Sequence, residues 1–169
     1  MPRRDVDLVS LYDDELEIGH LPGTSGRAVV SFAGIGLKVG PIKIYEFSKS
    51  LDGTPHDIYF IRDKERRWYA GLTEKITEII NAHLRSRNIQ ATACLGHSMG
   101  GFGAMYLASD LHNCNRVIAF SPQSTVNSEL VPWEGRWNRY RRKMPAAQGL
   151  DAPERLSPCN FLLGDCWLG

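Results

Sequence analysis

The chain has 169 residues, of which 43% are hydrophobic and 23% are charged, so it is long enough for one domain with a buried core. Its formal net charge of +1 gives no overall attraction to nucleic acid or to an anionic membrane. No apolar run approaches the ~20 residues of a membrane-spanning helix, and no apolar stretch follows the basic N-terminus as it would in a secretory signal. We therefore expect a cytoplasmic protein.

The four cysteines contain no C-x-x-C pair, which argues against a zinc site. In a chain without a signal segment, we expect free thiols in a reducing compartment. Nothing in the residue pattern calls for a metal or a cofactor, and the pattern predicts no particular oligomeric state.

The first third of the chain reads as β-strands separated by loops. Residues 5–19 predict two short strands joined by a turn. Residues 28–32 and 57–61 are apolar and rich in β-branched and aromatic side chains, which predicts two buried strands. Residues 41–50, which lie between them, predict a short helix.

A charged segment, residues 62–69, follows the second of these buried strands. Loops at the carboxyl ends of parallel strands border binding sites in α/β sheets, so Arg62 and Trp68 are candidates for substrate contact. The alternative is a solvated loop in which Arg62 and Asp63 settle the turn. The run of charges favours this second interpretation.

The clearest helix is predicted over residues 72–87. Its apolar residues recur at helical spacing, at Leu72, Ile76, Ile79, Ile80 and Leu84.

The next segment combines a strand, a sharp turn and a helix around the pattern G-x-S-x-G. Residues 91–96 are small and apolar, the turn holds Ser98, and apolar residues at helical spacing follow. This is the pattern of a nucleophile elbow. The turn is so tight that side chains at Gly96 and Gly100 would collide with their neighbours. It would lift the serine hydroxyl clear of the sheet and aim the first helix amides at the group that the serine attacks.

The sequence Gly96-His97-Ser98-Met99-Gly100-Gly101 resembles the elbow of the α/β-hydrolase superfamily, which often reads G-H-S-M-G-G. The resemblance implies that Ser98 is a nucleophile and that the Met99 amide stabilises the oxyanion. It also implies a second oxyanion amide in the loop after the third strand, which here reads Ala33-Gly-Ile-Gly36. We expect Ile35 as this donor, with Gly34 as the alternative.

The second half of the chain continues the alternation of strands and helices. Residues 116–121 and 160–163 predict further strands, and the overall order implies an α/β fold. We expect three layers, with a mostly parallel sheet between helices on both faces. Residues 124–158 occupy the place of a superfamily lid, and they are both aromatic and basic. A surface helix with solvated arginines explains their charge better than nucleic-acid binding does.

The resemblance also implies a catalytic acid after the last strand, where Asp165 stands, and a later histidine. No histidine follows Asp165, since all five precede it. Either the chain is a truncated form of a longer hydrolase, or it keeps the fold for binding without catalysis. The abrupt end favours truncation.

We therefore expect residues 1–169 to form a single α/β-hydrolase-like domain. The expected function is that of a serine hydrolase acting through Ser98 on an ester, thioester or other acyl bond of a small molecule. Because a serine without its base is a weak nucleophile, we expect weak activity or none in this form. The alternative is a non-catalytic binding or scaffold protein.

Overall fold

The structure is a computed structural model in which the described residues are 7–8, 14–36, 45–123, 125, 129–130, 132–133, 135–136, 138–141 and 160–164. Its strands are β1 (Asp7–Leu8), β2 (Leu16–Leu21), β3 (Arg27–Phe32), β4 (Asp57–Asp63), β5 (Ala91–His97), β6 (Cys114–Phe120) and β7 (Asn160–Gly164). Its helices are α1 (Ser48–Leu51), α2 (Thr73–Ser86), α3 (Met99–Leu107), the 3-10 helix η1 (Ala108–Asp110) and α4 (Asn138–Arg141).

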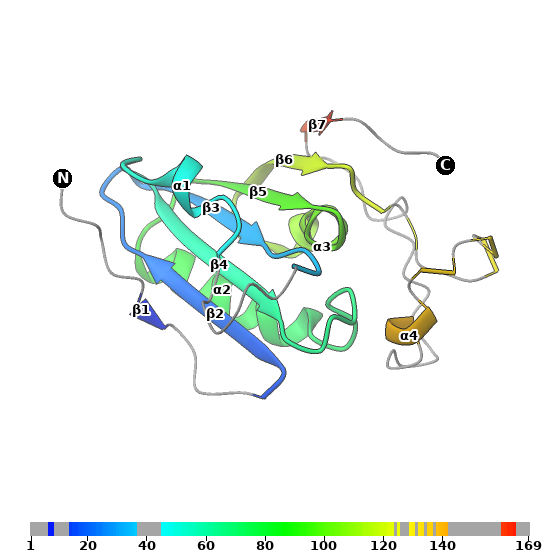
Figure 1. Ribbon diagram of the computed structural model, residues 1–169. Coiled ribbons are helices and arrows are strands. Elements are labelled where there is room, and N and C mark those ends of the chain that lie inside the picture. Colours follow the sequence, from blue (N-terminus) through cyan, green and yellow to red (C-terminus); the bar gives the residue numbers. More distant parts are fainter. Residues whose placement is uncertain are drawn as a thin grey trace.

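The seven strands form one sheet in the order β1-β2-β4-β3-β5-β6-β7 (Figure 1). The five strands from β4 to β7 in this order are parallel, whereas β1 and β2 are antiparallel to their neighbours. The predicted mostly parallel sheet with an N-terminal hairpin is therefore confirmed. The reversals of strand order place the β3–β4 connection and the β4–β5 connection on opposite faces of the sheet, because such crossovers are right-handed.

Both faces of the sheet are covered by apolar side chains. Along β4, Tyr59 and Ile61 join the larger core beneath α2 and α3, while Ile58 and Phe60 join a smaller cluster on the other face. Successive strand residues point to opposite faces, so a strand buried on both sides is apolar throughout. Leu51 of α1 packs on the smaller cluster, which agrees with the expected helices on both faces.

Helix α2 confirms the helix predicted from its apolar spacing. Ile76, Ile80 and Leu84 are buried, and Leu72 packs in the core directly before the first turn. These residues lie three or four positions apart, so they form one stripe that faces the sheet. No helix in the part of the chain that the structure describes is long and apolar enough to cross a membrane.

The parallel strands bring their carboxyl ends to one edge of the sheet. Phe32 is in register with Gly96, His97 with Phe120, and Phe120 with Gly164. In open α/β sheets, this edge is where ligands bind. The turn that holds Ser98 lies at this edge.

The segment after β4 corrects the expectation of a solvated loop. Trp68 and Tyr69 have no exposed surface, and Asp63 is 2% exposed. The Asp63 carboxylate accepts hydrogen bonds from the backbone amides of Glu65, Arg67 and Tyr69. A buried carboxylate that satisfies three amides holds a tight loop against the core, so Asp63 settles the turn without the help of Arg62.

The predicted lid, residues 124–158, lies in the chain between β6 and β7, and much of it falls outside the described residues. Within it, Tyr140 of α4 packs edge-on against Trp68, with ring centroids 6.2 Å apart. The Tyr140 hydroxyl also accepts a hydrogen bond from Arg66 at 3.3 Å. Trp133 is 70% exposed. The lid stays a prediction.

Candidate active site

Ser98 lies between β5 and α3 and has a backbone conformation that residues other than glycine rarely adopt. Its φ and ψ are 54° and −120°. For a residue with a side chain, such a conformation costs on the order of 1–3 kcal/mol and persists only where the surroundings impose it. The Ser98 amide is held by the Phe120 carbonyl at 2.9 Å, and its carbonyl accepts from the Phe102 amide at 3.0 Å.

Glycines allow the close packing that imposes this turn. A Cβ on Gly96 would lie 2.1 Å from the Gly100 carbonyl oxygen, and a Cβ on Gly100 would lie 2.1 Å from the Phe32 carbonyl oxygen. Real Cβ atoms do not come this close to backbone oxygen, so neither position accepts a side chain. Helix α3 therefore begins directly against the ends of β3 and β5. Its first amides, beginning with that of Met99, have no acceptor within the helix and lie beside Ser98.

The loop after β3, residues 33–36, lies beside the Ser98 turn. A Cβ on Gly34 would be 3.0 Å from the His97 carbonyl oxygen and 2.9 Å from the Glu46 Oε1 atom. The start of the loop is fixed by hydrogen bonds, because the Ala33 amide donates to the Ile61 carbonyl at 2.9 Å. The start of this loop therefore lies against the turn that holds Ser98, and the role of the Ile35 amide stays a prediction.

Glu46 is a residue of this region that sequence reasoning missed. Burial raises the pKa of its carboxyl group, while a hydrogen bond with the Gly34 backbone and the charge of His97 act in the opposite direction. Its Oε2 atom is buried and has no hydrogen-bond partner in the structure. No local pattern marks Glu46, since it reaches Gly34 only through the fold.

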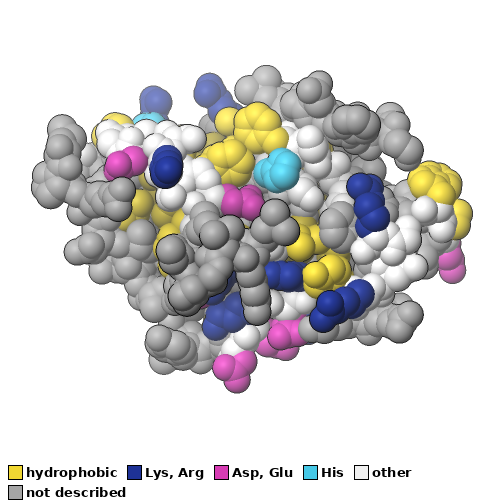
Figure 2. Space-filling view, in the orientation of Figure 1, with side chains coloured by type: hydrophobic (Ala, Val, Ile, Leu, Met, Phe, Trp, Pro, Cys, Tyr) yellow, Lys and Arg dark blue, Asp and Glu magenta, His cyan; other side chains and the backbone are white. Residues whose placement is uncertain are grey.

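Apolar side chains also border the Ser98 turn. Phe47 and Phe120 lie with ring centroids 5.8 Å apart, and Phe120 is 42% exposed. Figure 2, which has the orientation of Figure 1, shows hydrophobic side chains gathered beside a histidine and an acidic side chain. An exposed aromatic side chain at the carboxyl edge of the sheet is a suitable surface for the carbon skeleton of a ligand.

No histidine is hydrogen-bonded to Ser98 in the structure, although the described residues include all five. His97 is exposed at the end of β5, next to Ser98 in the chain. The other four lie near the opposite, amino-terminal edge of the parallel strands. They are His20, His56, His83 and His112.

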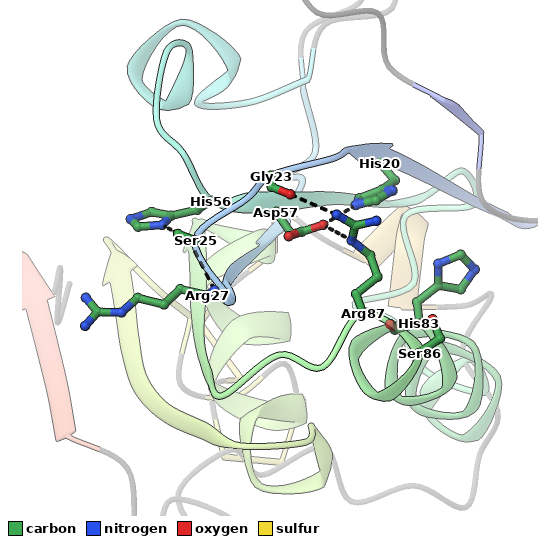
Figure 3. Close-up of polar contacts among 9 residues, drawn as sticks. All are labelled: His20, Gly23, Ser25, Arg27, His56, Asp57, His83, Ser86 and Arg87. Carbon is green, nitrogen blue, oxygen red and sulfur yellow. Dashed lines mark hydrogen bonds and ion pairs between the residues drawn. The ribbon is translucent and has the colours of Figure 1, made fainter.

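Figure 3 shows that opposite edge, where His20 and Arg87 both contact the Asp57 carboxylate. The His20 Nε2 atom lies 2.8 Å from Asp57 Oδ1. Ser25 forms a separate pair there, with its hydroxyl 2.8 Å from the His56 Nδ1 atom. These groups tie loops and the end of α2 together, and they lie away from Ser98.

The other predicted site residues are placed as follows. Met99 is fully buried, and only its backbone amide is a candidate donor. Arg62 pairs with Glu17 of β2 instead of pointing into open space. Trp68 donates from its Nε1 atom to Gln123 Oε1 at 2.8 Å and has no exposed surface. Asp165 lies outside the described residues. It directly follows β7, which ends at the same edge as β5.

No group of three or more His, Cys, Asp or Glu side chains suitable for a metal ion occurs among the residues that the structure describes. Cys94 is buried and Cys114 half-buried; their Sγ atoms lie 3.5 Å apart and form no disulfide.

Comparison with known structures identifies the class of fold. The capsule O-acetyltransferase of Neisseria meningitidis serogroup A is similar, with 17% identity over 88% of this chain and 67% of that one, at a TM-score of 0.63. Thermogutta terrifontis esterase 2, in its form phosphonylated by sarin, has 14% identity over 96% of this chain and 72% of that one, at a TM-score of 0.64. These likenesses, with the mostly parallel sheet, show an α/β-hydrolase-like fold.

A family model described as "Putative esterase" matches residues 60–157, which is more than half of the chain. The chain belongs to this esterase family. No curated protein gives a significant match to the sequence.

Proposed function

We propose that the protein is a serine-dependent acyl hydrolase in which Ser98 attacks the acyl carbon of a small ester, thioester or related substrate. The observation that carries this proposal is the backbone of Ser98. A strained serine between a strand and a glycine-packed helix is costly, and such strain concentrates at functional sites. Membership of the esterase family supports the same class of reaction.

In the proposed reaction, the Ser98 Oγ atom forms a bond to the acyl carbon and the carbonyl oxygen becomes an oxyanion. The Met99 amide and one amide of the loop after β3 would donate to that oxygen. We favour Ile35 over Gly34, because the Gly34 backbone already interacts with the Glu46 carboxylate. The Phe47–Phe120 pair would lie beside the carbon skeleton of the substrate.

The attack also requires a base that takes the Ser98 proton. In our proposal Asp165 is the acid of the triad, and it would orient a histidine that this sequence does not supply in the expected place. Because no histidine is bonded to Ser98 in the structure, we propose that this form has weak activity or none.

A non-catalytic binding protein is the second candidate function, and the same lack of a histidine partner for Ser98 favours it. The exposed Phe120 and the half-buried loop after β3 would then bind a ligand without reacting with it.

The test is labelling with a fluorophosphonate probe, followed by intact-mass measurement. Because no base among the described residues is bonded to Ser98, we expect slow labelling of the wild type, to no more than one probe per chain, and no labelling of Ser98→Ala. Ser25→Ala is the matched control, because Ser25 also contacts a histidine but lies at the opposite edge of the sheet. Slow labelling that requires Ser98 would support a poorly activated nucleophile. No labelling of a folded wild-type sample would overturn the proposal that Ser98 reacts in this form and would favour the binding protein.

A further inference from the structure

Tyr69 makes a buried contact with the loop that borders Ser98. Its side chain has no exposed surface, and its hydroxyl donates a hydrogen bond to the Ala33 carbonyl at 2.6 Å. A second, longer contact of 3.4 Å joins the same hydroxyl to the Ile61 carbonyl. Ala33 directly follows β3, so the Tyr69 hydroxyl fixes the point at which the loop leaves the sheet.

The position of Tyr69 depends on an unusual backbone in the segment after β4. Arg66, Trp68 and Tyr69 all have positive φ, at 57°, 55° and 63°. The Asp63 carboxylate stabilises this path by accepting from the Tyr69 amide at 3.1 Å. Positive φ is costly for residues other than glycine, and here three of four neighbouring residues have it. The fold therefore maintains a strained segment that directs the Tyr69 side chain towards Ala33.

The Tyr69 ring is held as firmly as its backbone. It packs edge-to-face on Phe32 with centroids 5.3 Å apart. On its other side it lies against α3, where a Cβ on Gly103 would come within 2.5 Å of the ring. The ring therefore contacts both β3 and α3, the helix that follows Ser98, and its hydroxyl has little freedom to move.

The hydrogen bond to Ala33 determines the orientation of a whole peptide group. The peptide bond is planar and trans, so the Ala33 carbonyl and the Gly34 amide point in opposite directions. Tyr69 holds the carbonyl end, and Glu46 interacts with the Gly34 backbone on the other side. With the Ala33–Gly34 peptide held between these two side chains, only the φ and ψ angles of Gly34 separate this fixed peptide from the Ile35 amide.

We propose that Tyr69 is a positioning residue for the oxyanion site, acting through its hydrogen bond to the Ala33 carbonyl. It does not touch the substrate. Its hydroxyl keeps the loop after β3 at the distance from α3 at which the Ile35 and Met99 amides can donate to the same oxygen. This inference rests on the proposed function and assigns a role to a residue outside the site itself.

The test compares Tyr69→Phe with Tyr59→Phe. Each change removes one buried hydroxyl and keeps the ring. The Tyr59 hydroxyl has no hydrogen-bond partner in the structure, and Tyr59 lies on β4 beside His20. We expect Tyr69→Phe to lower the kcat for ester hydrolysis, or the limiting rate of Ser98 phosphonylation, by roughly 10- to 100-fold with little change in KM. Tyr59→Phe should leave both constants near those of the wild type.

A second readout does not depend on a reactive serine. In the ¹⁵N–¹H spectrum, the Gly34 and Ile35 peaks should move in Tyr69→Phe and stay in place in Tyr59→Phe. If Ser98 of the wild type does not react, the proposed function fails and these peaks still decide whether Tyr69 holds the loop. If Ser98 reacts and Tyr69→Phe keeps the wild-type rate constants, or if the loop peaks do not move, the positioning role is overturned.

Discussion

The Arg87 guanidinium binds the Asp57 carboxylate and joins the end of α2 to the beginning of β4 (Figure 3). Asp57 is 1% exposed, and Arg87 also donates to the Gly23 carbonyl at 2.9 Å. Burying a carboxylate is costly unless it is paired, so the guanidinium compensates for the burial of Asp57.

We therefore predict that Arg87→Ala lowers the free energy of unfolding by about 2 kcal/mol. The estimate is below that for a fully buried pair, because a third of the Arg87 side chain is exposed and His20 remains as a partner of Asp57. Arg85→Ala is the matched control, since Arg85 lies exposed on the same last turn of α2. Urea unfolding measures both. Equal losses in the two variants would contradict the role of the Arg87–Asp57 pair.

The stability of the fold should also depend on the protonation of His20. Burial, together with the charges of Arg87 and His83, lowers the pKa of His20 from its usual 6.5 against the opposite effect of Asp57. As the pH falls below 6.5, the unfolded chain binds a proton at His20 before the folded chain does, so stability is lost. We expect the urea concentration at the unfolding midpoint to decrease as the pH is lowered from 7.5 to 5.5. The decrease should be smaller in His20→Gln than in the wild type. A variant with the wild-type pH dependence would exclude His20 as the source.

The contact between Gly100 and Phe32 predicts a strong effect of a single methyl group. In Gly100→Ala, the new Cβ would lie 2.1 Å from the Phe32 carbonyl oxygen. That oxygen belongs to the backbone of β3, which cannot easily move away. We expect a loss of about 3 kcal/mol or more in the free energy of unfolding, or failure to fold. In Gly135→Ala, the nearest atom to the new Cβ is 3.9 Å away, so the change should stay within about 0.5 kcal/mol. Similar values for both would show that the turn is looser than the structure indicates.

The main elements of the fold could be predicted because they depend on local patterns. The strand at residues 28–32, the helix at 72–87 and the strand–turn–helix around Ser98 each have a distinct apolar spacing or glycine pattern. All three were confirmed within one or two residues. The parallel sheet followed from their order along the chain.

The residues that surround Ser98 were harder to predict, because their contacts join distant parts of the chain. Glu46 meets Gly34, and Tyr69 meets Ala33 across 36 residues. The charges after β4 indicated a solvated loop, whereas Asp63 satisfies three backbone amides and the aromatic residues behind it turn inward. Charge content predicts exposure poorly where a carboxylate is satisfied by backbone donors.

Glu46 leads to a prediction about pH. Burial raises its pKa above the usual value of 4.5, so between that value and its folded-state pKa the folded chain holds a proton that the unfolded chain has lost. The stability that Glu46 contributes at low pH is therefore lost as the pH rises. Glu46→Gln, which stays neutral, should be more stable than the wild type at pH 7.5, and the difference in urea midpoint should shrink towards pH 4.5. A constant or inverted difference would contradict the prediction.

The assignment of the second oxyanion donor to Ile35 can be tested by removing one proton. Proline has no amide proton, so Ile35→Pro deletes the proposed donor, whereas Ile35→Ala shortens the side chain and keeps the amide. Loss of one such donor typically costs on the order of 10²- to 10³-fold in rate. We expect this loss in the rate of Ser98 phosphonylation for Ile35→Pro and a much smaller change for Ile35→Ala, with urea unfolding as a check that both variants are folded. If both folded variants react equally fast, the donor is another amide of the loop. Gly34 would then be the candidate, once its hydrogen bond to the Glu46 carboxylate is broken.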